Sequence, residues 1–385
     1  MNESVLSFKD KYFGDKNFYK MTLTIAIPII IQNLLTNLVS MADNIMVGQL
    51  GTNQMSGVAI INQLFFVFNL LVFGGMSGAG LFSAQYFGQK NHNGVRDVFR
   101  MKILIGITII AISLSVMIFL HEPLINMFLH EGSSSGNIQE TFNYAKNYLY
   151  IMVIGIAPFV ISNCYNTTLK ESGQTVVPMK AGVLAVVFDI VLNYIFIFGK
   201  LGFPAMGVVG AAIATVISRF VECGYLVIYT HIHSNDYPFI KHCYRTLKVP
   251  GSLVKKIIVT GAPLMLNEFL WAGGLTLQTQ ALSTKGLATV GGLNICNTIG
   301  NISNCIFVTM GTTIAIVVGQ LLGAGKMKEA KVTATRMAAF SLLISFGMII
   351  ILGLLGPVFP HFYNTTDEIR KLATKFIWAV AAATP

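Results

Sequence analysis

Charged residues are scarce in this sequence. Only 11% of its 385 residues are Asp, Glu, Lys or Arg, while 54% are hydrophobic and the mean hydropathy is +0.67. Soluble domains average about 25% charged residues, so this composition excludes an ordinary soluble protein and indicates a membrane protein. Cysteines are also few, five in all. They lie in apolar stretches or near a basic loop, where disulfides are not expected, and we predict that they are packing residues.

Several motifs of nucleotide-binding and catalytic proteins are missing. The stretch GGMSGAG (74–80) is not followed by Lys-Ser/Thr and lies inside an apolar run, so it lacks the phosphate-binding mechanism of a P-loop. Its spacing, with Gly74 and Gly78 four residues apart, is typical of helices that approach closely. His231 and His233 have no third ligand at a firm spacing, so no metal site is predicted there. The sequence predicts neither an enzyme nor an organic cofactor.

Long apolar runs, by contrast, are abundant. A helix that crosses about 30 Å of hydrocarbon needs about 20 mostly apolar residues. Ten stretches approach this length, and the end of the sequence cuts the last one short. They lie near residues 22–48, 56–84, 103–121, 144–163, 177–199, 206–230, 257–281, 288–319, 337–355 and 369–385. The sequence therefore predicts an all-α, multi-pass membrane protein.

The basic residues are distributed unevenly between the loops. Of the 26 Lys and Arg residues, nineteen lie in the N-terminal tail and alternate loops, six lie in the other loops, and Arg219 lies within a span. This asymmetry is the positive-inside pattern, which places the tail and the basic loops in the cytoplasm. The first twenty residues contain no cleavable signal peptide. We expect a protein of the plasma membrane, the inner membrane in a bacterium, with a cytoplasmic N-terminus and no nucleic-acid partner.

The chain repeats itself with an offset of 235 residues. AIPIIIQNLL around Pro28 matches GAPLMLNEFL around Pro263, and AQYFGQKNHNGVR further on matches GQLLGAGKMKEAK in the same register. The agreement extends over about 75 residues, which is too long for chance similarity between apolar segments. Each half is six spans long in plan. Because six is even, both halves enter the membrane from the same side.

The repeat predicts two lobes. Residues 1–230 would form an N-terminal lobe of six spans, 231–256 a cytoplasmic linker, and 257–385 a C-terminal lobe of four spans. The first half continues through two more spans after Pro158, whereas the second half stops at Pro385, the counterpart of Pro158. We therefore expect a twelve-span plan, of which about ten spans are present and about 70 residues are missing.

A carboxylate within the first span is the first candidate for function. Asp43 sits in SMADNIMVGQLG, directly after a run from Met21 to Val39 that carries no charge. An ionised Asp at mid-membrane depth costs from about 2.5 to more than 10 kcal/mol, so such residues usually face a polar interior. No basic residue lies within two helical turns of Asp43. Its carboxyl group would exchange a proton or coordinate a small cation such as Na⁺, unless it is simply hydrogen-bonded within the bundle.

A polar quartet is predicted on the fourth and fifth spans. Asp189 precedes Asn193 by one helical turn on the same face. Asn163 and Asn166 are three residues apart and also share a face. Three amides and one carboxylate would make a pocket for a proton or for a monovalent cation such as Na⁺. Ordinary hydrogen bonds between membrane helices are the alternative.

The remaining acids within spans are Glu222 and Glu268. Arg219 precedes Glu222 by three positions, a spacing that predicts an ion pair on one helical face. Glu268 has Asn33 as its repeat counterpart, so the two halves carry their acids at different positions. We therefore expect the two halves to have different roles in coupling. Glu268 is a candidate for substrate or ion coupling in the C-terminal lobe.

The order of these segments resembles the multidrug and toxic compound extrusion (MATE) transporters. The resemblance rests on MADNIMVGQLG in the first span, VLNYIFIFG and GVVGAAIATVIS in the fifth and sixth, and the paired motifs AQYFGQKNHNGVRDVFR and GQLLGAGKMKEAKVTATR. It covers the whole chain. It implies a two-lobed exporter of twelve helices that opens alternately to each side of the membrane. Such a transporter exchanges cationic, often aromatic compounds for Na⁺ or H⁺.

The resemblance also implies roles for the candidate residues. Asp43 matches the family's coupling carboxylate on the first span, and Glu268 matches the seventh-span acid of one branch. The N-terminal polar cluster of the family falls on Asn163, Asn166, Asp189 and Asn193. One branch carries Asn and then Asp along the fifth span, whereas the order is reversed here. The expected partners are small cationic molecules and membrane lipid, and the chain is expected to be a monomer.

Two other functions remain open from the sequence. A flippase of lipid-linked oligosaccharides shares this superfamily architecture, but it should have a strongly cationic cavity. Here the basic residues lie in the loops and towards the ends of the expected spans, except for Arg219. An intramembrane enzyme or a channel is the other alternative. Exchange of ethidium for Na⁺ or H⁺ in vesicles would discriminate between these functions and an exporter.

Overall fold

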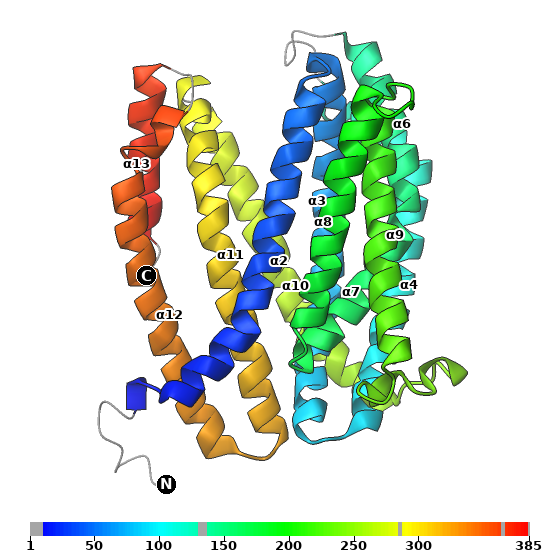
Figure 1. Ribbon diagram of the computed structural model, residues 1–385, viewed down its shortest axis with the longest axis vertical. Coiled ribbons are helices and arrows are strands. Elements are labelled where there is room, and N and C mark those ends of the chain that lie inside the picture. Colours follow the sequence, from blue (N-terminus) through cyan, green and yellow to red (C-terminus); the bar gives the residue numbers. More distant parts are fainter. Residues whose placement is uncertain (1–10, 130–136, 284–286, 363–365, 384–385) are drawn as a thin grey trace. The chain divides into compact units, whose positions relative to one another are not determined.

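The computed structural model describes residues 11–129, 137–283, 287–362 and 366–383, and every regular element within these ranges is a helix (Figure 1). The α-helices and short 3-10 helices are α2 (Lys16–Gly48), α3 (Thr52–Gly88), α4 (His92–Phe119), α5 (His121–Asn126), α6 (Ile138–Ile154), α7 (Ile156–Glu171), α8 (Val176–Phe198), α9 (Val208–Ile232), η2 (Pro238–Ile240), η3 (Cys243–Arg245), α10 (Gly251–Ser283), α11 (Leu287–Gly323), α12 (Met327–Leu355), η4 (Phe359–Phe362) and α13 (Asp367–Ala383).

The helices follow the ten apolar stretches. Within the described ranges, seven helices are long and apolar enough to cross a membrane, and α6 with α7 makes an eighth if that bent pair is one span. The other two stretches coincide with α10 and α13. Helix α13 has 17 residues, which is the short end of the range for a spanning helix. Helix α10 carries Asn267 and Glu268 in its middle, which lowers its apolar character. The all-α membrane fold is confirmed, with a span count that depends on these marginal helices.

The fourth stretch is broken rather than continuous. Helices α6 and α7 meet at Gly155 with a bend of 46°. Pro158 follows three residues later in the first turn of α7, where its missing N–H costs nothing because that group has no partner inside a helix anyway. The stretch predicted near 144–163 is therefore formed by two helices that meet at an angle. A glycine followed by a proline allows one helix to end and another to begin at an angle.

The packing divides the chain into two compact units. Unit 1 contains residues 1–30 and 267–385, and unit 2 contains residues 31–266. Helices α2 and α10 are each shared, because the division falls shortly after Pro28 in α2 and shortly after Pro263 in α10, which are equivalent positions of the repeat. These boundaries differ from the predicted lobes at 1–230 and 257–385, which rest on the repeat rather than on packing and stay a prediction.

Unit 2 is built around a large apolar core. Helices α8 and α9 pack side by side, α3 packs against α4, α6 and α7, and α9 packs against α6 and α7 (Figure 1). Its fully buried side chains include Ile61, Phe99, Leu149, Ile156, Leu169 and Leu226. Four of the five cysteines are buried and Cys223 is half-buried, all with free thiols. The prediction that the cysteines are packing residues is confirmed.

The glycine stretch of α3 permits a close helix contact within unit 2. A Cβ atom added to Gly78 would lie 2.4 Å from the Cα atom of Gly261 in α10, and one added to Gly74 would lie 3.0 Å from the Met265 side chain. No side chain fits at Gly78 without moving a backbone. The interpretation of this stretch as a packing surface is therefore confirmed.

Unit 1 has a smaller core made by both ends of the chain. The first half of α2 packs on α11 and α12 through a cluster of six buried side chains: Phe18, Ile25, Ile29, Ile316, Val317 and Met337. Helix α13 packs on α11, where a Cβ atom at Gly292 would lie 3.0 Å from the Leu372 side chain. The repeat partner of Pro158, Pro385, lies outside the described residues.

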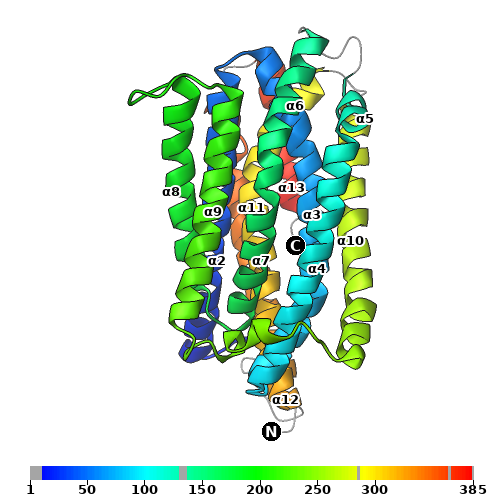
Figure 2. The ribbon, with the colours of Figure 1, turned by 90° about the vertical axis from the view of Figure 1, so that its right-hand side faces the viewer.

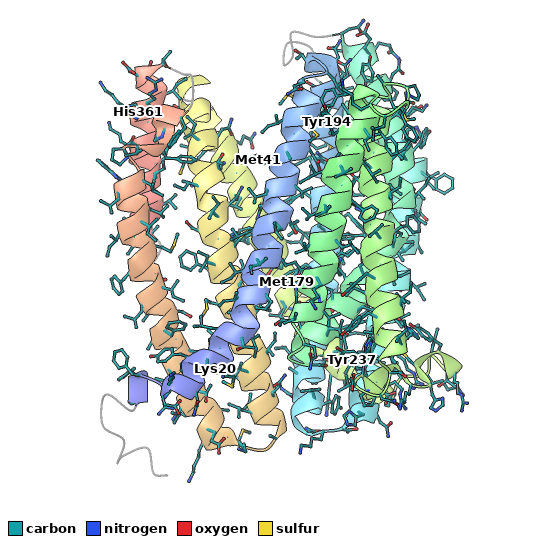
Figure 3. All side chains as sticks on the ribbon, in the orientation of Figure 1. Lys20, Met41, Met179, Tyr194, Tyr237 and His361 are labelled. Atoms are coloured by element: carbon teal, nitrogen blue, oxygen red, sulfur yellow. The ribbon has the colours of Figure 1, made fainter. Side chains whose placement is uncertain are left out.

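The segment that joins α9 to α10 is packed into unit 2. Figure 2 shows it crossing the ends of α7 and α4, and Figure 3 marks Tyr237 at its start. Phe239 stacks edge-on against Phe99 of α4 at 5.5 Å. Arg100 donates through Nε to the Cys243 carbonyl at 2.9 Å, and the Tyr244 hydroxyl is hydrogen-bonded to that of Tyr165. The predicted polar linker 231–256 thus contains a buried apolar stretch.

Cys243 offers a test of this packing. It is fully buried in the joining segment, and burial raises the pKa of its thiol to about 11. Because the thiolate is the reactive form, a single-cysteine variant that keeps Cys243 should react with a soluble maleimide at pH 8 at least about 100-fold more slowly than a cysteine on an exposed position. Leu247→Cys in a cysteine-free background is the matched control, since Leu247 is 41% exposed. Equal labelling rates would contradict the buried position.

Candidate functional site

Asp43 is held on α2 by a side chain from α8. The part of the helix that carries Asp43 belongs to unit 2. The carboxyl group is half-buried, and Asn193 donates through Nδ2 to Asp43 Oδ1 at 2.6 Å. Asp43 therefore faces a polar partner inside the unit.

Asn193 also bridges Asp43 to a second acid. The same Nδ2 atom donates to Asp189 Oδ2 at 3.1 Å, one helical turn earlier on α8. Ser218 on α9 donates to the other oxygen, Asp189 Oδ1, at 3.1 Å. Asp189 and Asn193 are 3% and 1% exposed, so both are shielded by protein. Three helices thus contribute the four residues of the Asp43 cluster, which we define as Asp43, Asp189, Asn193 and Ser218.

The two acids of this cluster also lie near each other. Asp43 and Asp189 carry like charges close to each other, since Asn193 Nδ2 lies 2.6 Å from an oxygen of one and 3.1 Å from an oxygen of the other. Two carboxyl groups can hydrogen-bond to each other only when one of them carries a proton, because two carboxylates offer acceptors alone. A proton between them removes one negative charge. A small cation bound to both carboxylates would do the same.

The cluster presents an oxygen without a partner. Both protons of the Asn193 amide are used by the two acids, which fixes the amide orientation and leaves Oδ1 buried without a hydrogen-bond partner. An unsatisfied buried polar atom costs about 1–3 kcal/mol. Carboxylate and amide oxygens are the ligands that hard cations take. The Asp43 cluster therefore has the donor chemistry to hold either a proton or one hard monovalent cation such as Na⁺.

The structure separates the other two amides of the predicted quartet from this cluster. Asn163 donates through Nδ2 to the carbonyl oxygen of Phe159, one turn earlier in its own helix, at 2.9 Å. Asn166 is 9% exposed, and its Oδ1 is buried without a partner. Among the described residues, no hydrogen bond joins either amide to Asp189 or Asn193. The arrangement brings Asp43, Asp189 and Asn193 together and leaves Asn163 and Asn166 outside their hydrogen-bond network.

The predicted ion pair between Arg219 and Glu222 is not formed. In the described part of the chain no pair of their charged atoms lies within 4 Å, although their charges attract each other. The Arg219 guanidinium lies instead over two aromatic rings, 5.0 Å from the centre of Phe159 and 5.4 Å from that of Phe65. The spacing of three residues allows Arg219 and Glu222 to share a helix face, but it does not determine which group the guanidinium contacts. Aromatic rings from α3 and α7 compete successfully for the guanidinium.

A buried ion pair in unit 2 was missed from the sequence. Lys102 on α4 is fully buried, and its Nζ lies 2.5 Å from Glu171 Oε2 at the end of α7. The same Nζ donates to the hydroxyls of Thr167 and Thr168 at 3.0 and 3.2 Å. Lys102 directly precedes the apolar stretch 103–121, so the sequence places it in a basic loop. Asn91, which caps α4 by accepting from the Gly94 N–H, is the signal that would have placed Lys102 inside a helix.

Glu268 is placed on α10 in unit 1, whereas the Asp43 cluster lies in unit 2. Its side chain is half-buried. The histidines set aside as metal ligands take part in ring stacking, with His231 against Tyr244 at 5.8 Å and His233 against Tyr229 at 4.2 Å.

Comparison with known families decides the identity of the fold. The sequence model of the MatE family matches residues 28–195 and 263–385, which is most of the chain. The chain belongs to the MatE family. The MATE resemblance found in the sequence motifs is thereby confirmed, and the family is one of multi-pass membrane transporters.

Relatives of this MatE chain carry names of multidrug resistance proteins. It is 29% identical over 362 residues to the "Probable multidrug resistance protein NorM" of Thermotoga maritima, covering 93% of this chain and 75% of that protein. It is 27% identical over 365 residues to a protein of the same name from Halalkalibacterium halodurans, covering 93% and 76%. The chain therefore spans about three quarters of the length of these relatives.

Solved MATE structures share the fold of this chain. A structure described as the outward-facing conformation of a multidrug resistance MATE family transporter of the MOP superfamily superposes with a TM-score of 0.85. It is 20% identical in sequence, and the match covers 96% of this chain and 80% of that one. At this identity the likeness shows the MATE fold alone.

Proposed function

We propose that this MatE chain is a secondary antiporter that exports cationic or amphipathic drugs in exchange for Na⁺ or H⁺. The observation that carries the proposal is Asn193, which donates to both Asp43 and Asp189 within an apolar helix bundle. Two acids at membrane depth are costly, and this pair retains an unpartnered amide oxygen beside it. A function in binding and releasing a cation explains why two acids are present at membrane depth despite their free-energy cost.

Linkage between two occupants supplies the mechanism. A cation or proton bound by Asp43 and Asp189 would favour one state of the transporter, and the drug would favour the other. The ion gradient then drives export because each ligand binds the two states with different affinity. Asn193 keeps both carboxyl groups within reach of one ion, and Ser218 orients Asp189. Glu268 on α10 would serve coupling or substrate binding in the C-terminal half.

The orientation is part of the proposal. The excess of Lys and Arg in the N-terminal tail and alternate loops supports a cytoplasmic N-terminus, in the inner membrane in a bacterium. Export then means transport from the side of the N-terminus to the opposite side. The relatives' names, which refer to multidrug resistance, support small organic molecules as substrates, and we propose cationic ones because the cluster acids would attract positive charge.

Ethidium transport under separate gradients tests the proposal. The purified chain in lipid vesicles should export preloaded ethidium when a sodium gradient or a pH gradient is imposed alone, and the gradient that works names the coupling ion. A tenfold gradient of either ion supplies about 1.4 kcal/mol per ion, enough for a tenfold ethidium gradient in a one-for-one exchange. Vesicles without protein measure the leak. Ethidium flux that equals the leak under both gradients would reject an antiporter.

A further inference from the structure

A row of charged side chains continues from the Asp43 cluster through unit 2. Asp189 interacts electrostatically with Arg219, Arg219 with Glu222, Glu222 with Lys170, Lys170 with Glu171, and Glu171 with Lys102. The signs alternate along this row. Buried charges are stable only when each has a compensating partner, so the row can be read as a sequence of pairs.

When acids and bases are paired starting from Lys102, one acid remains without a base. Lys102 lies 2.5 Å from Glu171, and Lys170 interacts electrostatically with Glu222. Arg219 then remains for Asp189. Arg219 directly follows Ser218, whose hydroxyl donates to Asp189 Oδ1 at 3.1 Å, and among the described residues Asp189 has no other basic partner. Asp43 stands beside Asp189 as the fourth acid against three bases. The acid pair and Arg219 together carry a formal charge of −1 when both carboxyls are ionised.

The fold holds Arg219 in this position. A Cβ atom on Gly155 would lie 3.2 Å from Arg219 Cδ, so the break between α6 and α7 provides the slot for the arginine stem. The guanidinium lies over Phe65 and Phe159, which attract a cation through their ring faces. Its Nη1 is buried without a hydrogen-bond partner. Because a guanidinium keeps its proton in proteins, the positive charge at this place is fixed.

We propose that Arg219 is a positioning residue that sets the ion count of transport, by reducing the charge of the Asp43 and Asp189 pair to −1 so that one monovalent cation neutralises it. The inference rests on the proposed antiport. With Arg219 present, one Na⁺ or H⁺ exchanges for one monovalent drug cation, and no net charge crosses the membrane. Without the guanidinium, the pair carries −2 and takes two monovalent cations.

The test compares the wild type with Arg219→Gln in lipid vesicles, with ethidium as the drug and a membrane potential imposed by potassium and valinomycin. The measured quantity is the ethidium concentration ratio at which net ethidium flux through the protein is zero. In the wild type this ratio should not change with potential. In Arg219→Gln one extra charge moves per cycle, so the ratio should change about 50-fold per 100 mV. Arg219→Lys keeps the charge and is the matched control, with wild-type behaviour expected.

The outcomes separate the two proposals. No exchange in the wild type overturns the antiport and this inference together. Exchange in both proteins with the same response to potential overturns the inference alone, because a purely structural role of Arg219 changes rate or stability but not the ion count. If Arg219→Gln does not accumulate in the membrane, the wild type alone gives the answer. An ethidium ratio that is independent of potential supports one cation per drug, and a ratio that changes about 50-fold per 100 mV overturns the inference.

Discussion

Asp43→Asn is expected to reduce gradient-driven ethidium export to the leak rate of vesicles without protein. The amide has nearly the same shape and can still accept from Asn193 Nδ2, whose bond to Asp43 Oδ1 is 2.6 Å long. It can neither take up a proton at ordinary pH nor offer a negative charge to a cation. The coupling ion then binds both states of the transporter with the same affinity, and its gradient can no longer drive transport.

Two measurements accompany this variant. The amount of protein in the membrane should be unchanged, because the substitution removes a buried charge rather than adding one. Asp367→Asn is the matched control: this acid is 84% exposed in its side chain and pairs with Arg370 on the surface of α13, so export should stay at the wild-type rate. Gradient-driven export by Asp43→Asn at the wild-type rate would refute the coupling role.

Lys102→Met is expected to lower the free energy of unfolding by about 3–5 kcal/mol. The substitution leaves Glu171, 13% exposed in its side chain, without the ammonium group that lies 2.5 Å away. It also removes the donor to the hydroxyls of Thr167 and Thr168. The measurement is the unfolding midpoint of the purified protein in detergent under increasing denaturant. The double variant Lys102→Met with Glu171→Gln should regain most of the loss, since it removes both charges.

A surface ion pair gives the matched comparison for Lys102. Lys326 lies 2.9 Å from Glu329, but the two side chains are 54% and 60% exposed. Exposed pairs contribute about 0–1 kcal/mol because water screens them and both side chains lose rotamer freedom. Lys326→Met should therefore change the midpoint little. Equal effects of the two substitutions would show that the burial of Lys102 does not determine its contribution.

Local rules predicted the parts of the site that lie on one helix. Asp189 and Asn193 share a face because they are one turn apart, and the structure joins them by a hydrogen bond of 3.1 Å. The bond between Asn193 and Asp43 spans 150 positions. It depends on how α2 packs beside α8, which the apolar pattern does not specify. The repeat and the spans could be predicted since they rest on periodicity and length, whereas the partners of each polar group could not.

The polar contacts that differ from the predictions have local physical causes. Asn163 shares a helix face with Asn166, but its amide bonds the carbonyl oxygen of Phe159 in its own helix, a competition common for short polar side chains. Gly155 and Pro158 break a stretch whose hydropathy is continuous. Arg219 has Glu222 within reach, yet the rings of Phe65 and Phe159 come from distant parts of the chain. Hydropathy does not predict which partner a polar or charged side chain contacts in the folded protein.

The buried joint between α9 and α10 limits where the protein can be divided. Phe239, Ile240 and Cys243 are at most 4% exposed and belong to the core of unit 2, so a protease site, an affinity tag or a chain break placed among them would expose apolar surface. The residues just beyond, up to Pro250, are largely exposed. Two separately expressed fragments that reassemble into a transporter should therefore be cut near Leu247, with the whole joint kept on the first fragment.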